Sequence, residues 1–266
     1  MSCESGDQEM NQTDRRRYLI KGLLKERPEY ENMQIPSDAG EQKMLLRSLM
    51  NIRMPEEMDH AFLQIQDAYL SEENEKKGMV TLADMEEIQP DLSIWKGDIT
   101  RLGVGAIVNA ANSGMTGCYQ PCHNCIDNGI HTYAGIQLRN YCNKMMMKQG
   151  QEEPTGQAKI TPAFNLPCDY VIHTVGPIVQ GTLTKEHERL LVSCYEACLR
   201  IADENKVKSI AFCCISTGVF MFPNKRAAEL AVQTVKQYKE KTKSKIKVIF
   251  NVFKEEDERL YKQLLG

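Results

Sequence analysis

Residues 92–117 read LSIWKGDITRLGVGAIVNAANSGMTG, two short apolar runs that each lead directly into polar and glycine-rich residues. The runs LSIW at 92–95 and AIVNA at 106–110 are rich in β-branched and apolar side chains, so we predict a strand at each. Glycine, asparagine and serine gather after the runs, which is typical of loops. The stretch therefore predicts strands that carry polar side chains at their carboxyl ends.

The same alternation continues to the end of the chain. Four further runs predict strands, namely AKITPAF at 158–164, YVIHTV at 170–175, SIAFCCI at 209–215 and KVIFNVF at 247–253. Helical periodicity is found at residues 126–149, 186–206, 223–241 and 257–266. Because strands alternate with helices, we expect an α/β layered domain whose six-stranded sheet is mostly parallel and covered on both faces.

The first 80 residues follow a different pattern, with apolar residues at three- and four-residue intervals. We predict three helices there, over 15–26, 41–53 and 55–77, with Pro55 in the first turn of the third. The change of pattern divides the chain into a helical N-terminal extension, residues 1–80, and an α/β domain, residues 81–266.

The composition excludes several classes of protein. With 266 residues, 42% of them hydrophobic, the chain has enough apolar surface for one large core or two modest ones. The mean hydropathy is −0.44, and no run approaches the roughly 18 apolar residues of a membrane span, so no membrane partner is expected. The first twenty residues lack the apolar stretch of a secretory signal, which favours a cytoplasmic protein. Ten cysteines are too few for a disulfide scaffold and are expected to be free thiols.

The net charge of −3 conceals an asymmetry between the two parts of the chain. Residues 1–90 hold 11 Lys and Arg against 19 Asp and Glu, whereas residues 91–266 hold 22 against 17. Six of the later lysines lie in one run, residues 236–247, where a solvated helix end explains them better than a nucleic-acid surface. We therefore expect no nucleic-acid partner.

Polar residues after three predicted strands are candidates for ligand binding, since ligands of such sheets lie beyond the carboxyl ends of the strands. Asn109 and Asn112 have amides suited to sugar hydroxyls, although both residue types are also common in turns. The loop ISTGVFMFP at 215–223 offers backbone N–H groups to an anion and is neither a Walker loop nor a GxGxxG loop. Asp98 either caps a helix or accepts from an exocyclic amino group such as that of adenine.

The segment CYQPCHNCIDNGIH, residues 118–131, contains the strongest signal for chemistry. Its thiols and imidazoles are Cys118, Cys122, His123, Cys125 and His131. In a reducing compartment such a cluster favours a metal, and Zn²⁺ takes thiolate and imidazole ligands. The alternative is a group of loop thiols without a metal.

The spacing CxxxCxxC also matches the iron–sulfur motif of radical-SAM enzymes. That family places the motif early in a long barrel, whereas only 141 residues follow Cys125 here and they predict four strands. It also gives His123 no role. The iron–sulfur interpretation is therefore the weaker one.

Three motifs in order, GDIT at 97–100, VNAANS at 108–113 and STGVF at 216–220, resemble the macrodomain family over residues 80–266. The resemblance implies a three-layer α/β/α sandwich around a six-stranded mixed sheet that binds ADP-ribose. Asp98 then takes the adenine amino group with Ile99 contributing backbone beside it, and Asn109 and Asn112 face the distal ribose. The diphosphate is wrapped by Ser216, Thr217, Gly218, Val219 and Phe220. Met221 departs from the family pattern, which often has a glycine there.

Cys118 to Asn128, together with the helical extension, resembles the zinc-containing branch of that family. The resemblance implies Zn²⁺ as cofactor, held by Cys118, His123 and Cys125. It further implies a bacterial hydrolase that removes ADP-ribose from mono-ADP-ribosylated proteins. The modification would come from a partner sirtuin, on a lipoylated carrier similar to the glycine-cleavage H protein.

Hydrolysis requires an activated water, and three protein ligands leave zinc an open position for it. We assign catalysis to Asn112 and Asp127, with Asp127 orienting the water and His131 one helical turn further along the same face. Asp127 as a plain helix N-cap is an alternative. A second alternative for the whole protein is a non-catalytic ADP-ribose-binding module with a structural zinc closed by Cys122.

Overall fold

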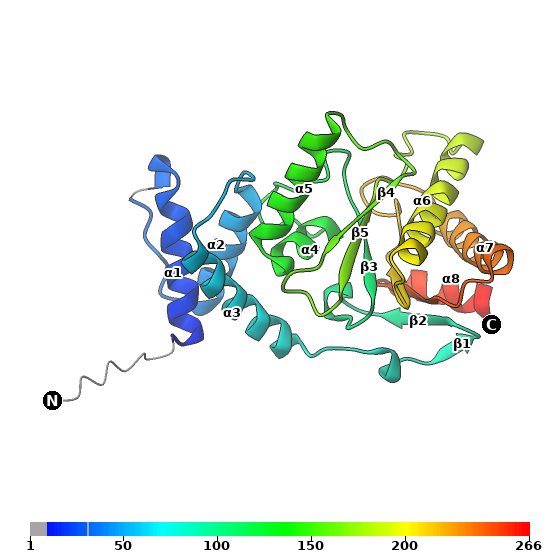
Figure 1. Cartoon of the computed structure of the whole chain (residues 1–266), viewed down its shortest axis with the longest axis horizontal. Helices are drawn as coiled ribbons and strands as arrows, with labels where there is room; N and C mark the ends of the chain where they lie inside the picture. The colour runs from blue at the N-terminus through cyan, green and yellow to red at the C-terminus, as the bar shows by residue number, and fades with distance from the viewer. Residues whose placement is uncertain (1–9, 31) are drawn as a thin grey trace.

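The strands of the α/β domain form one seven-stranded sheet in the order β1-β2-β7-β6-β3-β5-β4 (Figure 1). This computed structural model describes residues 10–30 and 32–266. The strands are β1 Glu87–Gln89, β2 Leu92–Lys96, β3 Ala106–Ala110, β4 Ala158–Pro162, β5 Tyr170–Thr174, β6 Ser209–Phe212 and β7 Lys247–Val252. All six strands expected from the sequence are present.

The sheet is mixed, with five central strands parallel to one another. β2, β7, β6, β3 and β5 are parallel neighbours, whereas the edge strands β1 and β4 run antiparallel to β2 and β5. The expectation of six strands was wrong by one, because β1 has only three residues, EIQ, and no alternating pattern. Asp91, with φ of 61°, forms the tight turn that folds β1 back onto β2.

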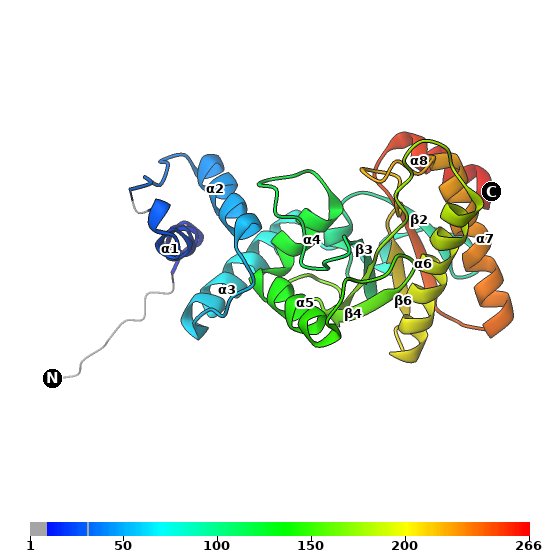
Figure 2. The ribbon, with the colours of Figure 1, turned by 90° about the horizontal axis from the view of Figure 1, so that it is seen from above.

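Helices cover both faces of this sheet, as Figures 1 and 2 show. Their bounds are α4 Ile126–Ala134, α5 Ile136–Gln149, α6 Lys185–Glu204, α7 Asn224–Thr242 and α8 Glu255–Leu265. In both views α4 and α5 lie on one side, and α6, α7 and α8 lie on the other. The three-layer α/β/α architecture expected from the sequence is confirmed.

The single helix predicted over residues 126–149 is two helices in the structure. Gly135 separates α4 from α5 with φ of 97°, a conformation that other residues rarely adopt. A Cβ at this position would also lie 2.7 Å from Nε2 of Gln66, so the chain needs a glycine here. The periodicity continued across the break, which is why the sequence did not indicate it.

The extension consists of the three predicted helices, α1 Gln12–Lys25, α2 Ala39–Ile52 and α3 His60–Lys77. Residues 1–9 of the predicted extension lie outside the described part of the chain. Pro55 precedes α3 rather than lying in its first turn, because Asp59 caps the helix by accepting from the Phe62 amide at 2.8 Å. A small separate core joins the three helices, and it includes Leu19, Ile20, Leu49, Phe62, Leu70 and, from α5, Ile136.

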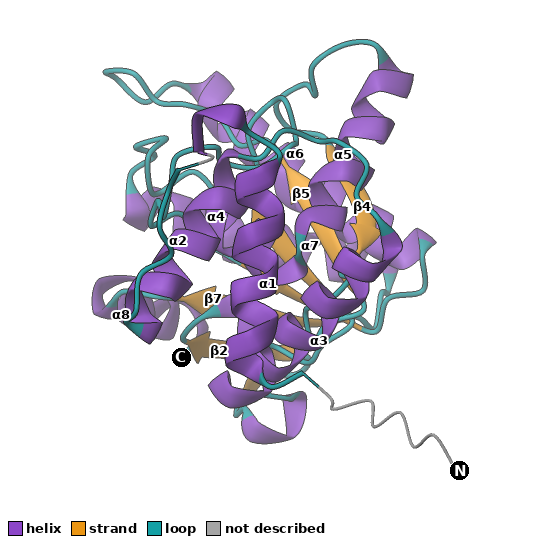
Figure 3. Ribbon diagram, turned by 90° about the vertical axis from the view of Figure 1, so that its left-hand side faces the viewer, coloured by secondary structure: helices purple, strands orange, loops and turns teal. Residues whose placement is uncertain are grey.

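The extension packs beside α4 and α5 and not on a face of the sheet (Figures 1 and 2). Figure 3 shows α1 in front, on the outer side of the extension. Helices α2 and α3 make the contacts with α4. Whether the boundary at residue 80 separates two folding units stays a prediction.

Two composition-based expectations concern the whole chain. All nine cysteines within the described residues are free thiols, as expected. Among the helices of the described residues, none is both long and apolar enough to cross a membrane.

Candidate functional site

The candidate ligand-binding residues lie at one edge of the sheet, because the five central strands are parallel and their carboxyl ends point the same way. β2 ends next to Asp98, β3 ends next to Asn112, and β6 runs into the loop that contains Ser216. The structure therefore brings together segments that are more than 100 positions apart in the sequence.

Asp98 caps the short 3₁₀ helix Ile99–Arg101, as one interpretation of the sequence expected. Its Oδ1 accepts from the Thr100 amide at 3.0 Å and from the Thr100 hydroxyl at 2.7 Å. Its Oδ2 lies 3.4 Å from Nζ of Lys77, the last residue of α3. Burial lowers the pKa of Lys77 to about 8, and the Asp98 carboxylate offsets only part of this shift. The extension thus contacts the predicted adenine residue directly.

The loop after β6 holds its shape through backbone contacts. Ser216 has φ of 65° and is buried, and its hydroxyl has no hydrogen-bond partner within the described residues. Thr217 Oγ1 donates to the Cys214 carbonyl at 3.0 Å, and the Phe220 carbonyl accepts from the Val179 amide at 2.9 Å. Gly218 and Val219 are exposed between these fixed points. This arrangement suits an anion that approaches the backbone.

Asn112 and Asp127 meet at the end of β3. Asn112 is exposed, and its Nδ2 donates to the Gly117 carbonyl at 3.1 Å and lies 3.4 Å from Asp127 Oδ2. Asp127 is only 5% exposed, and burial raises the pKa of its carboxyl to about 6. The two predicted catalytic residues are therefore in contact.

Asn109 lies deeper than the sequence suggested. It is fully buried, and its Nδ2 donates to Asp127 Oδ1 at 2.8 Å and lies 3.1 Å from His173 Nδ1. Its Oδ1 has no hydrogen-bond partner within the described residues. In this structure the Asn109 amide holds Asp127 from below.

The buried imidazole of His131 lies beside Asp127 without a hydrogen bond to any group of the described residues. His131 Nε2 lies 3.6 Å from Asp127 Oδ1, which confirms that the two share one face of α4. Burial keeps the pKa values of His131 and His173 well below 6.5, so both imidazoles are neutral at neutral pH. A Cβ at Gly117, whose φ is 86°, would lie 2.8 Å from the His131 ring, so only glycine lets the loop pass over this imidazole.

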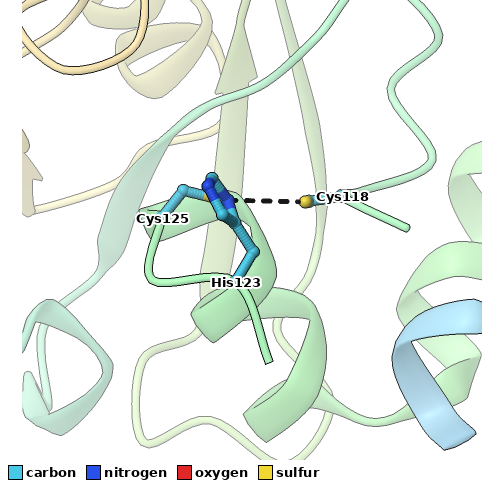
Figure 4. Close-up of side chains that lie close together, drawn as sticks. All are labelled: Cys118, His123 and Cys125. Carbon is cyan, nitrogen blue, oxygen red and sulfur yellow. Dashed lines mark hydrogen bonds between the residues drawn. The ribbon is translucent and has the colours of Figure 1, made fainter. Parts of the chain in front are cut away.

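Cys118, His123 and Cys125 converge in the loop between β3 and α4 (Figure 4). Their ligand atoms all lie within 4.8 Å of one another, and Cys118 Sγ is 3.7 Å from His123 Nδ1. Burial raises the pKa of Cys125 to about 11, and the nearby Cys118 sulfur adds to the shift. Two sulfurs and an imidazole this close form a donor set that fits Zn²⁺.

Cys125 is the N-cap of α4, since its Sγ accepts from the Asn128 amide at 3.4 Å. The alternative in which Asp127 caps this helix is therefore wrong. Asp127 lies inside the first turn of α4, and its carboxylate contacts the side-chain amides of Asn109 and Asn112 instead of capping the helix.

Cys122 points away from this group of three. Its Sγ lies 3.2 Å from Ser48 Oγ and 3.5 Å from the Met44 carbonyl, both on α2. Its backbone is in the left-handed region, with φ of 50°. A closed zinc site would need the Cys122 sulfur as its fourth ligand. In this structure that sulfur faces the extension instead.

Several residues at the site gave no signal in the sequence. Arg47, Asn51 and Lys77 come from the extension, and only the fold brings them near the loops. Phe253 follows β7 beside β2 and is 73% exposed, an unusual position for a large apolar side chain. In the sequence it is the last residue of the predicted strand KVIFNVF, and nothing in that run distinguishes it from the other apolar residues.

Fold and site define the class of the protein as an α/β/α sandwich with polar, glycine-containing ligand loops at the carboxyl edge of its sheet. Comparison with known proteins agrees, since the family model described as Macro domain matches residues 108–231. The chain is 58% identical over 261 residues to a protein-ADP-ribose hydrolase of Treponema medium, covering 97% of this chain and all of that protein. It is 45% identical over 248 residues to a protein-ADP-ribose hydrolase of Staphylococcus aureus strain MSSA476, covering 92% and 93%. The chain belongs to the macrodomain family.

Solved structures with the same fold include two with nucleotide ligands. The Oceanobacillus iheyensis macrodomain with ADP matches with a TM-score of 0.61 at 36% identity, covering 68% of this chain and 93% of that one. The Trypanosoma brucei macrodomain in complex with ADP-ribose matches with a TM-score of 0.65 at 26% identity, covering 82% and 95%.

Proposed function

We propose that this protein is a zinc-dependent hydrolase that removes ADP-ribose from modified proteins. The observation that carries the proposal is the position of the Cys118, His123 and Cys125 group, in the same loop that joins Asn112 to Asp127. The names of the relatives that match over nearly the whole chain support the same activity.

The nucleotide half of ADP-ribose would bind along the ends of β2, β7 and β6. Asp98 would accept from the adenine amino group, with the Ile99 backbone beside it, and exposed Phe253 offers a flat apolar surface for the base. The loop Ser216–Phe220 would surround the diphosphate with backbone N–H groups. Asn112 would then meet the distal ribose.

The donor set of Cys118, His123 and Cys125 fits Zn²⁺, and these three residues would hold it. When bound, zinc supplies Lewis acidity and lowers the pKa of a water. The cation would also stabilise both sulfurs as thiolates, which burial alone disfavours at Cys125.

The reaction needs a group that orients the attacking water and accepts its proton, and we assign this role to Asp127. Asn109 fixes Oδ1 of this carboxylate from below, and Asn112 lies against Oδ2 at the exposed side. The proton would go to Oδ2, the oxygen nearer the predicted ribose position. Asn112 would hold a ribose hydroxyl.

The alternative of a non-catalytic ADP-ribose-binding module requires Cys122 to close the zinc site. The contact of Cys122 with Ser48 supports three ligands instead of four. A Cys122→Ala variant should retain its zinc, and loss of the metal from this variant would favour the binding module.

The partners implied by the resemblance remain part of the proposal. The substrate would be a mono-ADP-ribosylated protein in the cytoplasm, modified by a sirtuin, with a lipoylated carrier as one substrate. Release of ADP-ribose from sirtuin-modified carrier, compared with another mono-ADP-ribosylated protein, tests this substrate preference.

The direct test of the function measures ADP-ribose release from mono-ADP-ribosylated protein together with zinc content. Chelation should stop release, and added Zn²⁺ should restore it. Full activity of a zinc-free sample would contradict the metal dependence, and absence of release from every modified protein would contradict hydrolysis.

A further inference from the structure

Helix α2 of the extension lies against the loop that carries the three metal ligands. Three of its side chains reach this loop, from positions on one face of the helix. They are Arg47, Ser48 and Asn51. The contacts are made to residues 122 and 123, between the ligands Cys118 and Cys125.

Asn51 holds the turn of the loop at Cys122. It is 1% exposed, and its Oδ1 accepts from the Cys122 amide at 2.9 Å, while its Nδ2 donates to Thr132 Oγ1 at 3.0 Å. Cys122 has φ of 50°, which costs free energy for a residue with a side chain, so the turn needs outside support. Asn51 supplies this support and anchors it to α4.

Arg47 fixes the backbone of His123, the residue that follows Cys122. Its guanidinium donates to the His123 carbonyl at 3.0 Å and to Asn128 Oδ1 at 2.7 Å. Asn128 in turn donates to the Gln120 carbonyl at 3.0 Å. The backbone of the imidazole ligand is therefore connected to both α2 and α4.

Arg139 of α5 ties the end of α2 to the start of the loop. Its Nη1 donates to the Asn51 and Arg53 carbonyls at 2.7 and 2.6 Å, where α2 ends and a cation is favoured. Its Nε donates to the Thr116 carbonyl at 2.7 Å, and its Nη2 lies 3.3 Å from the Cys118 carbonyl. Through Arg139, the backbone position of Cys118 is thus also connected to α2.

We propose that α2 is a positioning element of the metal site, in which Asn51 and Arg47 fix the turn at residues 122–123 so that His123 faces Cys118 and Cys125. This inference rests on the proposed zinc site. It assigns the extension a role in metal affinity, beyond covering α4 and α5. Asn51 and Arg47 are positioning residues, since neither belongs to the ligand group.

The test measures the zinc dissociation constant of the full chain by competition with a chromophoric chelator. Asn51→Ala and Arg47→Ala should each weaken zinc binding by about 10–100-fold, the usual effect of losing a side chain that orients metal ligands. ADP-ribose affinity, measured by calorimetry, should stay unchanged in both variants.

Lys43→Ala is the matched control, because Lys43 lies one turn earlier on α2 and pairs with Glu73 of the extension. It should bind zinc as the wild type does. Equal losses in Lys43→Ala and Asn51→Ala, or wild-type zinc affinity in folded Asn51→Ala, would overturn the inference. If Asn51→Ala does not fold, the partly exposed Arg47 decides the question, and wild-type zinc affinity in Arg47→Ala overturns it.

Zinc binding by the wild-type protein distinguishes failure of the proposed zinc site from failure of this inference. A wild-type protein that binds no zinc overturns the metal site itself, and this inference with it. A wild-type protein that binds zinc, with variants that bind it equally well, overturns only the role of α2.

Discussion

The two halves of the candidate site are held in different ways. The predicted nucleotide half, the loops after β2 and β6, is fixed mostly by contacts within the α/β domain, such as those of Thr100 and Val179. The predicted metal half, the loop between β3 and α4, is held across a boundary by α2 of the extension. The difference indicates that nucleotide binding and hydrolysis are separable, so each half has variants that leave the other intact.

The largest effect is expected at Asp127 in the metal half. Asp127→Asn keeps the shape of the side chain and removes the proton acceptor, so we expect turnover to fall by about 10²–10⁴-fold. Affinity for ADP-ribose should change much less, because the nucleotide contacts come from other loops. Single-turnover release and calorimetry measure the two quantities, and turnover within tenfold of the wild type would remove Asp127 from catalysis.

The next effect follows from removing the extension. Residues 81–266 should fold, with a melting midpoint lower by roughly 10 °C, as the loss of several kcal/mol implies for a domain of this size. The reason is that α4 and α5 lose their contacts with the extension, among them those of Asn51 with Thr132 and of Gln66 with the Ile136 amide. An unchanged midpoint in thermal melts would mean that the extension is a loosely tethered module.

A smaller effect is expected in the nucleotide half. Asp98→Ala should weaken ADP-ribose binding by about 1–3 kcal/mol, the range for losing one buried polar contact. Zinc content should be unchanged, because Asp98 contacts Thr100 and Lys77 and none of the three ligands. Calorimetry with metal analysis checks both, and unaltered affinity would remove Asp98 from the adenine site.

The last of these effects concerns Lys77, through which the extension contacts Asp98 and Thr100 of the nucleotide half. Because burial lowers the pKa of Lys77 to about 8, the unfolded chain binds more protons than the folded one between about pH 8 and 10.5. The cost of burying this lysine therefore falls as the pH rises through that window. Relative to Lys77→Met, the wild type should gain roughly 2 kcal/mol of unfolding free energy between about pH 7.5 and 10. Denaturant melts of both proteins test this, and parallel pH profiles would contradict it.

The sequence predicted those features that depend on neighbouring residues. Runs of β-branched side chains located all six longer strands. The thiol and imidazole cluster in residues 118–131 contains the three side chains that converge, Cys118, His123 and Cys125, which is the set that the family resemblance implied. Strand β1 was missed, because a three-residue edge strand is defined by its pairing with β2 and not by its own pattern.

Features that depend on long-range packing could not be predicted in this way. The burial of Asn109 follows from its place on β3, next to Asp127 of α4, whereas its position near the end of the predicted strand AIVNA suggested that it faces a ligand. The contact of Asn51 with Cys122 joins residues 71 positions apart, and nothing in either segment indicates it. The break at Gly135 belongs to the same class, since the helical periodicity continues on both sides of it.

The central claim is that the metal half performs hydrolysis while the nucleotide half binds, and a paired measurement on Cys125→Ala tests it most directly. Turnover and ADP-ribose affinity are measured on the same folded, zinc-depleted sample. We expect turnover to fall by about 10³-fold or more, since Lewis acidity acts mainly in the transition state, with ADP-ribose affinity close to that of the wild type. Near-normal turnover by this variant with no metal bound would contradict the account.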